Sequence, residues 1–492
     1  MSLKHLETRR NDLLQGLVDM GDTGLAESER HDFVLRKFLP LAEYGRVLDP
    51  DCLLVIGDKG VGKTQIFRAI QDPEGRKAIT ELVSNRLKAE WLERGEWLVG
   101  YSSRGQEFAW NEVWSSLTPK FNATDWRQVW SALFIRTLAQ ASKDSLPPLP
   151  PQVQQIVQAT ANDLEGLRRR FSDAVVQAGT WLDEVDRQLE SNDRWIFVAY
   201  DELDRITGTS LEGYQMILQG LLQFWSVNSR RWRRLRPKIF LRRDLFEQAM
   251  LSGSDVSKLN AQRAELSWST RNLYAMLAKR IFNQNDLFAE YFAGCQPAGS
   301  THGALGWLPT APDAEDYRPM IEHLIGRYMG ANYKKGVTFK WLPGHCMDAN
   351  GLILPRSFVR LIEFAAKEEQ EKQRAVWPHL LHPTSLTLAL DQVSEMRVQE
   401  LGDEFGWMPK VQKKLKQTRS EVPASRFELA EALKLDWSKE NSRPPETSGT
   451  GLVSFLGRLG VFYEIPDGRI NVRDLYLRGF GFKRKGGVSR GF

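Results

Sequence analysis

GDKGVGKT, residues 57–64, decides the fold expected of this chain. It matches the pattern GxxxxGK[ST], in which glycines let backbone N–H groups turn toward phosphate oxygens. The apolar run Cys52–Ile56 before it is predicted to be a strand, and Thr64–Ile70 opens the helix behind it. The loop then lies at a helix N-terminus, whose positive end favours an anion. The stretch therefore predicts a P-loop NTPase, an α/β fold with a doubly wound parallel sheet.

The residues of this loop are the predicted nucleotide ligands. Lys63 is expected to reach the β- and γ-phosphates of ATP, and the Thr64 hydroxyl to ligate Mg²⁺. The predicted ATP-binding residues of this segment are Gly57, Asp58, Lys59, Gly60, Val61, Gly62, Lys63, Thr64 and Gln65.

Two adjacent carboxylates follow a second apolar strand, Trp195–Tyr200. Asp201 is predicted to hold Mg²⁺ beside Thr64, and Glu202 to orient and polarise an attacking water. A P-loop kinase of small molecules does not need the second carboxylate, because its substrate supplies the nucleophile. The base-reading motif of a GTPase, Asn/Thr-Lys-x-Asp, does not follow. The pair therefore favours an ATPase, and an acidic helix cap is the simpler alternative for Asp201.

A third strand, Ile239–Leu241, ends in Arg242. A guanidinium at the end of this strand could point at the γ-phosphate, and an ion pair with a neighbouring helix is an equal alternative. The predicted catalytic residues are thus Glu202, Lys63 and Arg242.

Composition narrows the class further. The chain has 492 residues, 42% of them hydrophobic and 26% charged, which predicts a globular protein of two to four domains. No apolar run approaches the roughly 20 residues that cross a bilayer, and the first ten residues lack a signal-peptide core. We therefore expect no membrane contact and a cytoplasmic protein, as the three scattered cysteines also indicate. His345, Cys346 and Asp348 cluster, but no further ligands complete a metal site.

The chain divides into five predicted regions: a helical region 1–50, an ATPase core 51–253 with a helical insertion at about 105–190, a helical lid 254–375, a helical and winged-helix-like domain 376–478, and a basic glycine-rich tail 479–492. In the fourth region, the helix Thr450–Leu459 and the hairpin Val461–Val472 form the pattern that ends a winged helix. Such a domain binds DNA or packs on the nucleotide domain. The tryptophans of the insertion favour core packing over a ligand surface.

The net charge is only +5, so local basic clusters indicate more about binding partners than the overall charge does. Ser229–Lys238 holds six basic residues in ten. Nucleic-acid binding, a subunit contact and a solvated loop are all compatible with this composition, and its two apolar residues could stack on bases or anchor the segment to the core.

Together, these motifs resemble the AAA+/STAND division of P-loop ATPases, and several stretches are similar to a bacterial DELD-containing family of P-loop ATPases linked to anti-phage conflict systems. These stretches are YDELDRI (200–206), FLRRDLF (240–246), ELSWSTRNLYAMLAKRI (265–281) and LPRSFVRLIEFA (354–365). The resemblance covers most of residues 30–480. It implies that Arg242 senses the γ-phosphate and that Arg356, at a helix start in the lid, binds the nucleotide as well. Arginine in place of asparagine at the sensing strand, and the long insertion, favour a switch over a ring-shaped unfoldase.

The expected function is that of an ATP-binding and ATP-hydrolysing switch with ATP and Mg²⁺ as cofactors. The resemblance also implies a homo-oligomer, an effector protein partner and a setting in anti-phage defence. Two alternatives stay open: an ATP-dependent DNA-transaction factor serving transposition or partition, and a DNA-binding regulator in which ATP is structural.

Overall fold

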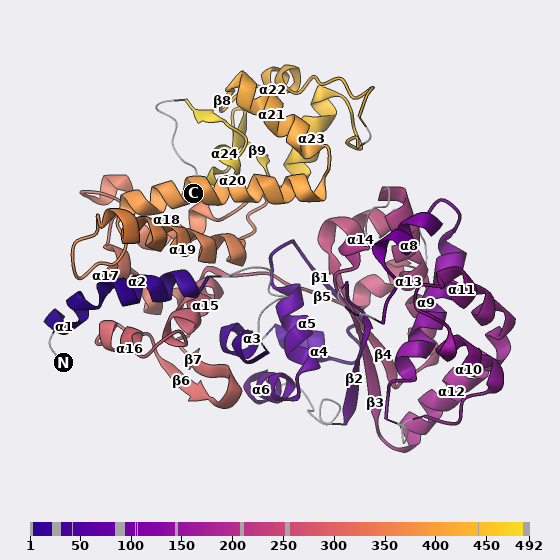
Figure 1. The fold of residues 1–492 in the computed structure, drawn as a ribbon. Helices are drawn as coiled ribbons and strands as arrows, with labels where there is room; N and C mark the ends of the chain where they lie inside the picture. Colours follow the sequence, from indigo (N-terminus) through magenta and orange to yellow (C-terminus); the bar gives the residue numbers. More distant parts are fainter. Residues whose placement is uncertain are drawn as a thin grey trace. The chain divides into compact units, whose positions relative to one another are not determined.

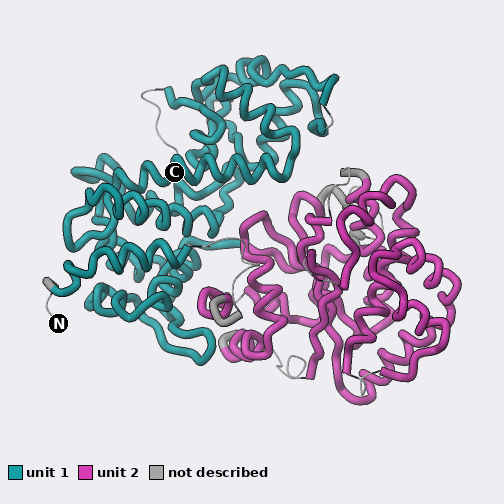
Figure 2. Tube along the Cα trace, in the orientation of Figure 1, with its two compact units in different colours: residues 1–28, 267–492 teal, residues 29–266 magenta. Residues whose placement is uncertain are grey.

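The computed structural model describes residues 3–21, 31–41, 43–83, 94–103, 105, 107–142, 146–206, 211–250, 256–440 and 442–485. The chain forms two compact units, one of residues 29–266 and the other of residues 1–28 and 267–492 (Figure 2). The first 50 residues thus contribute to both units. Within the described residues, no helix combines the length and the apolar character that a bilayer crossing requires.

A five-stranded parallel sheet forms the centre of the unit of residues 29–266, with strand order β2-β3-β4-β1-β5 (Figure 1). The strands are β1 (Leu54–Gly57), β2 (Gly95–Tyr101), β3 (Trp195–Tyr200), β4 (Leu235–Arg242) and β5 (Arg263–Glu265). The sequence predicts β1, β3 and β4, and the apolar stretch Trp97–Tyr101 predicts β2. It misses β5 because Arg-Ala-Glu has no apolar run. Parallel strands end at one edge, so the residues that follow β1, β3 and β4 meet there.

Helices cover both faces of this sheet, as a doubly wound fold requires (Figure 1). On one face, Phe67 of α5 (Lys63–Gln71) packs edge-on against Phe240 of β4, with 5.8 Å between ring centroids. On the other, Trp130 of α9 (Ala123–Leu138) meets Tyr200 of β3 at 5.9 Å. The remaining helices of this unit are α3 (His31–Lys37), α4 (Tyr44–Leu48), α6 (Pro73–Val83), α8 (Asn111–Leu117), α10 (Pro151–Gln158), α11 (Leu164–Asp173), α12 (Val175–Ser191), α13 (Leu211–Arg231) and α14 (Arg243–Met250).

The insertion between β2 and β3 is helical, and its tryptophans build the core on the second face. Trp114, Trp126 and Trp130 are at most 1% exposed. Trp114 stacks on Trp126 with 5.3 Å between centroids, a geometry that contributes roughly 0.5–1.5 kcal/mol beyond the area buried. The prediction of core packing is confirmed for these three. Trp110 is the exception, since it is 69% exposed.

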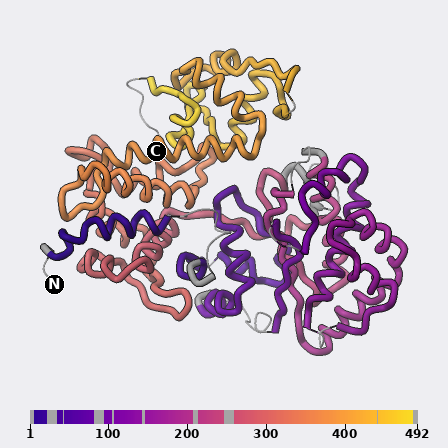
Figure 3. The backbone as a smooth tube through the Cα atoms, viewed as in Figure 1, coloured from indigo at the N-terminus to yellow at the C-terminus, as the bar shows by residue number. Residues whose placement is uncertain are grey.

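The second unit contains the helical region that the sequence predicts as a lid, and we keep that name for it. Its helices are α15 (Thr270–Phe282), α16 (Leu287–Tyr291), α17 (Arg318–Ile325), α18 (Thr338–His345) and α19 (Pro355–Lys372). The N-terminal helix α2 (Arg10–Asp19) lies along α19, so the start of the chain shares a core with helices of its second half (Figure 3). Leu13, Leu14 and Leu17 of α2 are fully buried. The region also holds the hairpin β6 (Gly299–His302) and β7 (Gly306–Pro309), which the helical prediction omits.

A winged-helix domain closes the chain, as predicted. Its elements are α20 (Pro383–Glu404), α21 (Met408–Thr418), β8 (Glu421–Val422), α22 (Arg426–Ala432), α23 (Gly449–Arg458), β9 (Phe462–Glu464), β10 (Ile470–Val472), α24 (Asp474–Leu477) and β11 (Lys483–Arg484). The antiparallel pair β9–β10 is the wing, and Ala424 bridges to Ile470 on its far side. The last strand, β11, pairs in parallel with β8.

Candidate nucleotide site

The glycine loop between β1 and α5 has the backbone that its sequence predicts. Gly60 and Gly62 adopt φ of +87° and +98°, the left-handed region that favours glycine. A Cβ on Gly57 would lie 2.6 Å from Cγ1 of Val61, so the strand end also requires glycine. Val61 itself is 4% exposed and anchors the loop to the core. The tight turn delivers the chain into the N-terminus of α5.

Lys63, the first residue of α5, folds back over the loop. Its Nζ donates hydrogen bonds to the carbonyl oxygens of Gly57 at 2.8 Å and of Asp58 at 2.9 Å. Burial lowers the pKa of Lys63 to about 8, although the nearby carboxylates of Asp204 and Asp201 oppose the shift. The nearby carboxylates therefore compensate the positive charge of Lys63 only in part, and an anion bound at the loop would stabilise that charge.

Asp201 follows β3 directly, and its carboxylate lies beside the Thr64 hydroxyl. Its backbone N–H donates to the Tyr101 carbonyl at 3.0 Å, which fixes the end of β3 against β2. Burial raises the pKa of the Asp201 carboxyl to about 7, against the hydrogen bond that the Thr64 hydroxyl donates to it. Its Oδ2 atom is buried and has no hydrogen-bond partner among the described residues.

A buried carboxylate oxygen without a partner, next to a hydroxyl, is the oxygen donor chemistry that Mg²⁺ prefers. Thr64 and Asp201 therefore fit the predicted metal. No group of three or more His, Cys, Asp or Glu side chains suited to a metal occurs in the described part of the chain. Water and phosphate oxygens would complete the shell, as is usual for Mg²⁺. His345 of the lid instead contacts Asp474, with 3.2 Å between Nε2 and Oδ2.

Glu202 is held by side chains from the end of β2. Its backbone has φ of +56°, which is uncommon for a residue other than glycine. The Ser103 hydroxyl donates to Oε2 at 2.6 Å and the Ser102 hydroxyl at 3.3 Å. Arg205 approaches Oε1 at 3.6 Å. Sequence reasoning missed both serines, and the only signal for them is that they follow a strand ending at the same sheet edge.

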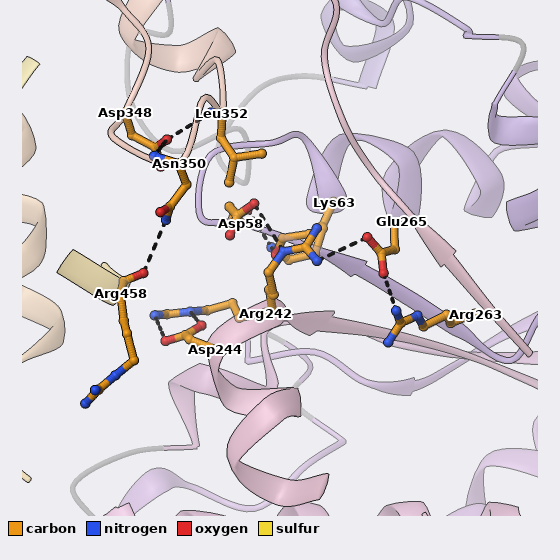
Figure 4. Close-up of polar contacts among 12 residues, drawn as sticks. Asp58, Lys63, Arg242, Asp244, Arg263, Glu265, Asp348, Asn350, Leu352 and Arg458 are labelled. Atoms are coloured by element: carbon orange, nitrogen blue, oxygen red, sulfur yellow. Dashed lines mark hydrogen bonds and ion pairs between the residues drawn. The ribbon is translucent and has the colours of Figure 1, made fainter. Parts of the chain in front are cut away.

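Arg242, the last residue of β4, is 8% exposed and pairs with carboxylates (Figure 4). Its Nε and Nη2 donate to the two oxygens of Asp244 at 3.1 and 2.7 Å. Asp204 lies 3.6 Å from Nη1. Burial alone would lower the pKa of Arg242, but Asp244 and then Asp204 outweigh it and raise that pKa. Of the two roles that the sequence allows for Arg242, the structure shows the ion pair. Contact of Arg242 with the γ-phosphate stays a prediction.

Arg243 ties the glycine loop to the sheet. Its guanidinium lies 3.6 Å from Asp58 and donates to Glu265 of β5 at 3.1 Å. Glu265 pairs in turn with Arg263 at 2.6 Å (Figure 4). Asp58 therefore acts as an anchor of the loop, and the unpredicted strand β5 supplies the other side of this network.

The predicted site residues thus fall into two groups. Lys63, Thr64, Asp201, Glu202 and Arg242 come together at the carboxyl edge of the sheet. Lys59 and Gln65 are half-buried residues of the same segment. Arg356 belongs to the other unit, at the start of α19, where it lies 3.5 Å from Glu400 of α20.

The basic segment 229–238 is not a solvated loop, because it forms the end of α13 and the start of β4. Trp232 and Leu235 are at most 3% exposed, so the apolar residues anchor the segment to the core. Most of its cations have partners within the same unit: Arg231 with Asp183, Arg233 with Glu190, Arg234 with Asp193, Arg236 with Asp51, and Lys238 with the carbonyl oxygens of Asp49 and Cys52. Packing inside the unit accounts for most of this charge.

No protein-family model and no curated protein sequence matches this chain. Among solved structures, it is similar to the Aeropyrum pernix ORC2 protein in its ADPNP–ADP complexes, with 12% identity, a TM-score of 0.34 and coverage of 91% of both chains. The Aeropyrum pernix ORC1 protein in complex with DNA gives 14% identity and a TM-score of 0.34, over 90% of this chain and 94% of that one. The ADP form of ORC2 gives 12% identity and a TM-score of 0.29, over 94% of both chains.

Proposed function

We propose that this chain is an ATP-binding and ATP-hydrolysing switch of the AAA+/STAND type. One observation carries the proposal: Glu202 follows Asp201 at the sheet edge that also holds Lys63 and Thr64. A phosphate loop with one carboxylate suffices to bind a nucleotide with its metal. The second carboxylate supplies a general base, which hydrolysis by water requires and phosphoryl transfer to a bound substrate hydroxyl does not.

Each residue has a distinct role in this proposal. Backbone N–H groups of the glycine loop and the ammonium of Lys63 bind the phosphates. Thr64 and Asp201 hold Mg²⁺, which neutralises phosphate charge when it is bound. Glu202 orients a water and accepts its proton. The Ser103 hydroxyl donates to Oε2 of this carboxylate at 2.6 Å and restrains its position.

Two arginines are proposed to report the γ-phosphate. Arg242 would exchange its contacts with Asp244 for phosphate oxygens, and Arg356 of the lid would exchange Glu400. In this way the nucleotide would bias the arrangement of the lid and the winged helix, which is the sense in which the chain is a switch.

The decisive experiment changes Glu202 to Gln, which preserves size and hydrogen bonding but removes the base. ATP should bind with unchanged affinity, while turnover falls by roughly 10²-fold or more. Glu190→Gln is the matched control, since Glu190 is a half-exposed carboxylate of the same unit on α12. Turnover near that of the wild type in Glu202→Gln would show that Glu202 caps a turn and is not the base.

The setting and the partners rest on the resemblance to the DELD-containing family. We propose a homo-oligomer acting with an effector protein in anti-phage defence. Light scattering with ATP and with ADP tests assembly. Phage plating on bacteria that express the wild type or Lys63→Ala tests the setting, and equal plating efficiency contradicts it. Strong stimulation of turnover by DNA would instead favour a DNA-transaction factor.

A further inference from the structure

A basic hollow lies along α21 in the winged-helix domain. The helix buries Met408, Val411 and Leu415 on its inner side. Its outer side borders a hollow of about 550 Å³, lined by Pro409, Gln412, Lys413, Lys416, Gln417 and Arg419. The lining contains three cations and no carboxylate.

The three cations of this hollow are uncompensated. Lys413, Lys416 and Arg419 are exposed, and none of them forms an ion pair with another residue of the described chain. Lys410, on the same helix, shows the contrast, because its Nζ lies 2.7 Å from Glu440. Three neighbouring like charges repel one another, so an anionic ligand would lower the energy of this surface.

The end of the chain adds to the same surface. Lys416 packs beside Gly481, where a Cβ would lie 2.8 Å from Cγ of Lys416. Beyond it, the backbone N–H of Lys483 donates to the Ser420 carbonyl at 3.1 Å, which places β11 against the end of α21. Lys483 faces Glu421 across the strand pair. We name the surface of Lys413, Lys416, Arg419 and Lys483 the α21 face.

The parts of a winged helix that usually read DNA are poor in available cations here. Arg458, at the end of α23, lies 3.6 Å from Glu446 and stacks over Phe455. Arg469, in the wing, pairs with Asp467 at 2.6 Å. The remaining exposed residues of α23 are small and neutral. Positive charge that is open to a ligand therefore lies on the α21 face rather than on the α23–wing side.

We propose that the α21 face binds the phosphate backbone of duplex nucleic acid. Lys413 and Lys416 lie three residues apart on α21, about 4.5 Å along the helix axis, and Arg419 follows directly after the end of the helix. Gln412 and Gln417 lie among them, and lysine, arginine and glutamine are side chains that contact phosphate and sugar. The lining has no large apolar side chain to insert into a bilayer, which disfavours a lipid surface.

Contacts to phosphate carry no sequence information, so binding through this face is independent of sequence and sensitive to salt. The face belongs to the unit that does not contain the glycine loop. Its binding of nucleic acid can therefore be tested separately from the ATPase function.

The test measures fluorescence anisotropy of two unrelated labelled duplexes with the full-length protein over a range of salt concentrations. The variant combines Lys413→Gln, Lys416→Gln and Arg419→Asn, where Asn suits the left-handed φ of +48° at residue 419. Affinity for both duplexes should fall at least about tenfold, and the log–log salt slope should shrink by about 0.9 for each phosphate that the variant leaves without its cation. Unchanged ATP affinity and melting temperature would show that the variant is folded.

The matched control changes Arg458 and Arg469 to Gln on the α23–wing side. It should bind both duplexes as the wild type does. Loss of binding in this control with retention in the triple variant overturns the proposal, as does a wild type that binds no duplex. A triple variant that binds duplex normally but no longer sediments with phosphatidylserine vesicles would assign the face to a membrane surface instead.

Discussion

At the scale of single residues, the charge of Asp201 makes the site sensitive to pH. The pKa of about 7 follows from burial, and Mg²⁺ binding requires the ionised carboxylate. Ionisation of Asp201 rises from roughly one tenth at pH 6 to roughly nine tenths at pH 8. The apparent affinity for Mg²⁺, measured through Mg²⁺-dependent binding of a fluorescent ATP analogue, should therefore rise about tenfold over this interval.

Asp201→Asn is the control for this prediction, because it removes the titrating group. It should weaken Mg²⁺ binding at both pH values and abolish the difference between them. The raised pKa of Asp201 also makes the stability of the fold depend on pH. Since the folded pKa exceeds the unfolded value of roughly 3.9, this group makes the nucleotide-free fold less stable as pH rises from about 4 to about 7. A flat Mg²⁺ affinity in the wild type would contradict the assignment.

Ser103 is predicted to restrain the general base. Its hydroxyl donates to Glu202 at 2.6 Å, and a hydrogen bond to a carboxylate contributes roughly 1.5–3 kcal/mol. Ser103→Ala should release the carboxylate and raise basal ATP turnover several-fold, with ATP affinity unchanged. Ser102→Ala removes only a hydrogen bond of 3.3 Å and should have a smaller effect. A fall in turnover in Ser103→Ala would mean that the serine positions the base for the reaction.

The sequence predicts the site residues that lie in local motifs and misses those that only long-range contacts bring to the site. Lys63, Thr64, Asp201 and Glu202 lie in short patterns whose chemistry is evident without a fold. Ser103 is 99 residues from Glu202, and only the pairing of β2 with β3 brings the two together. Neither the hydrophobic periodicity nor the composition of the sequence reveals such a contact.

At the scale of elements, Asp186 of α12 is predicted to fix the start of β4. Its carboxylate is 7% exposed and accepts hydrogen bonds from the backbone N–H groups of Arg233, Arg234 and Leu235 at 2.9, 2.7 and 3.0 Å. Asp186→Ala leaves these donors without a partner, so the free energy of unfolding should fall by at least about 2 kcal/mol in urea denaturation.

Arg233→Gln is the comparison, because it removes a charge from the same turn. The Arg233 side chain is 76% exposed and its ion pair with Glu190 is a surface one, so the unfolding free energy should change by less than about 0.5 kcal/mol. Equal losses in the two variants would show that the cations, and not the carboxylate beneath them, hold this turn.

This turn also shows where prediction of elements fails. The strand Trp195–Tyr200 is predicted to the residue because an apolar run is a local signal. For the segment 229–238 the sequence leaves nucleic-acid binding, a subunit contact and a solvated loop open, because most of the carboxylates that compensate it come from α12, more than 40 residues earlier. β5 is missed for a related reason, since its pairing with β1 makes a strand of three residues that carry no apolar pattern.

At the scale of the whole molecule, each unit has a core of its own. In one unit, the tryptophans of the insertion pack on the sheet. In the other, α2 packs on α19, although some 340 residues separate them in sequence. The α/β class and the winged helix follow from sequence patterns. The packing of the N-terminal helix α2 on α19 does not follow from them, because the apolar face of an amphipathic helix does not indicate which surface it packs against.

Two cores predict two unfolding transitions in calorimetry, only one of which responds to ADP, because ADP lacks the γ-phosphate that is proposed to reach Arg356 of the other unit. A ligand stabilises the unit that binds it by RT ln(1 + [L]/Kd), about 2.7 kcal/mol at a free concentration of 100 Kd. Saturating ADP with Mg²⁺ should therefore raise the melting temperature of the unit of residues 29–266 and leave the other transition in place. Lys63→Ala should remove the shift. Val411→Ala, at a fully buried position of α21, should lower only the transition that ADP does not move. A single transition that both ADP and Val411→Ala displace would mean that the two units unfold as one.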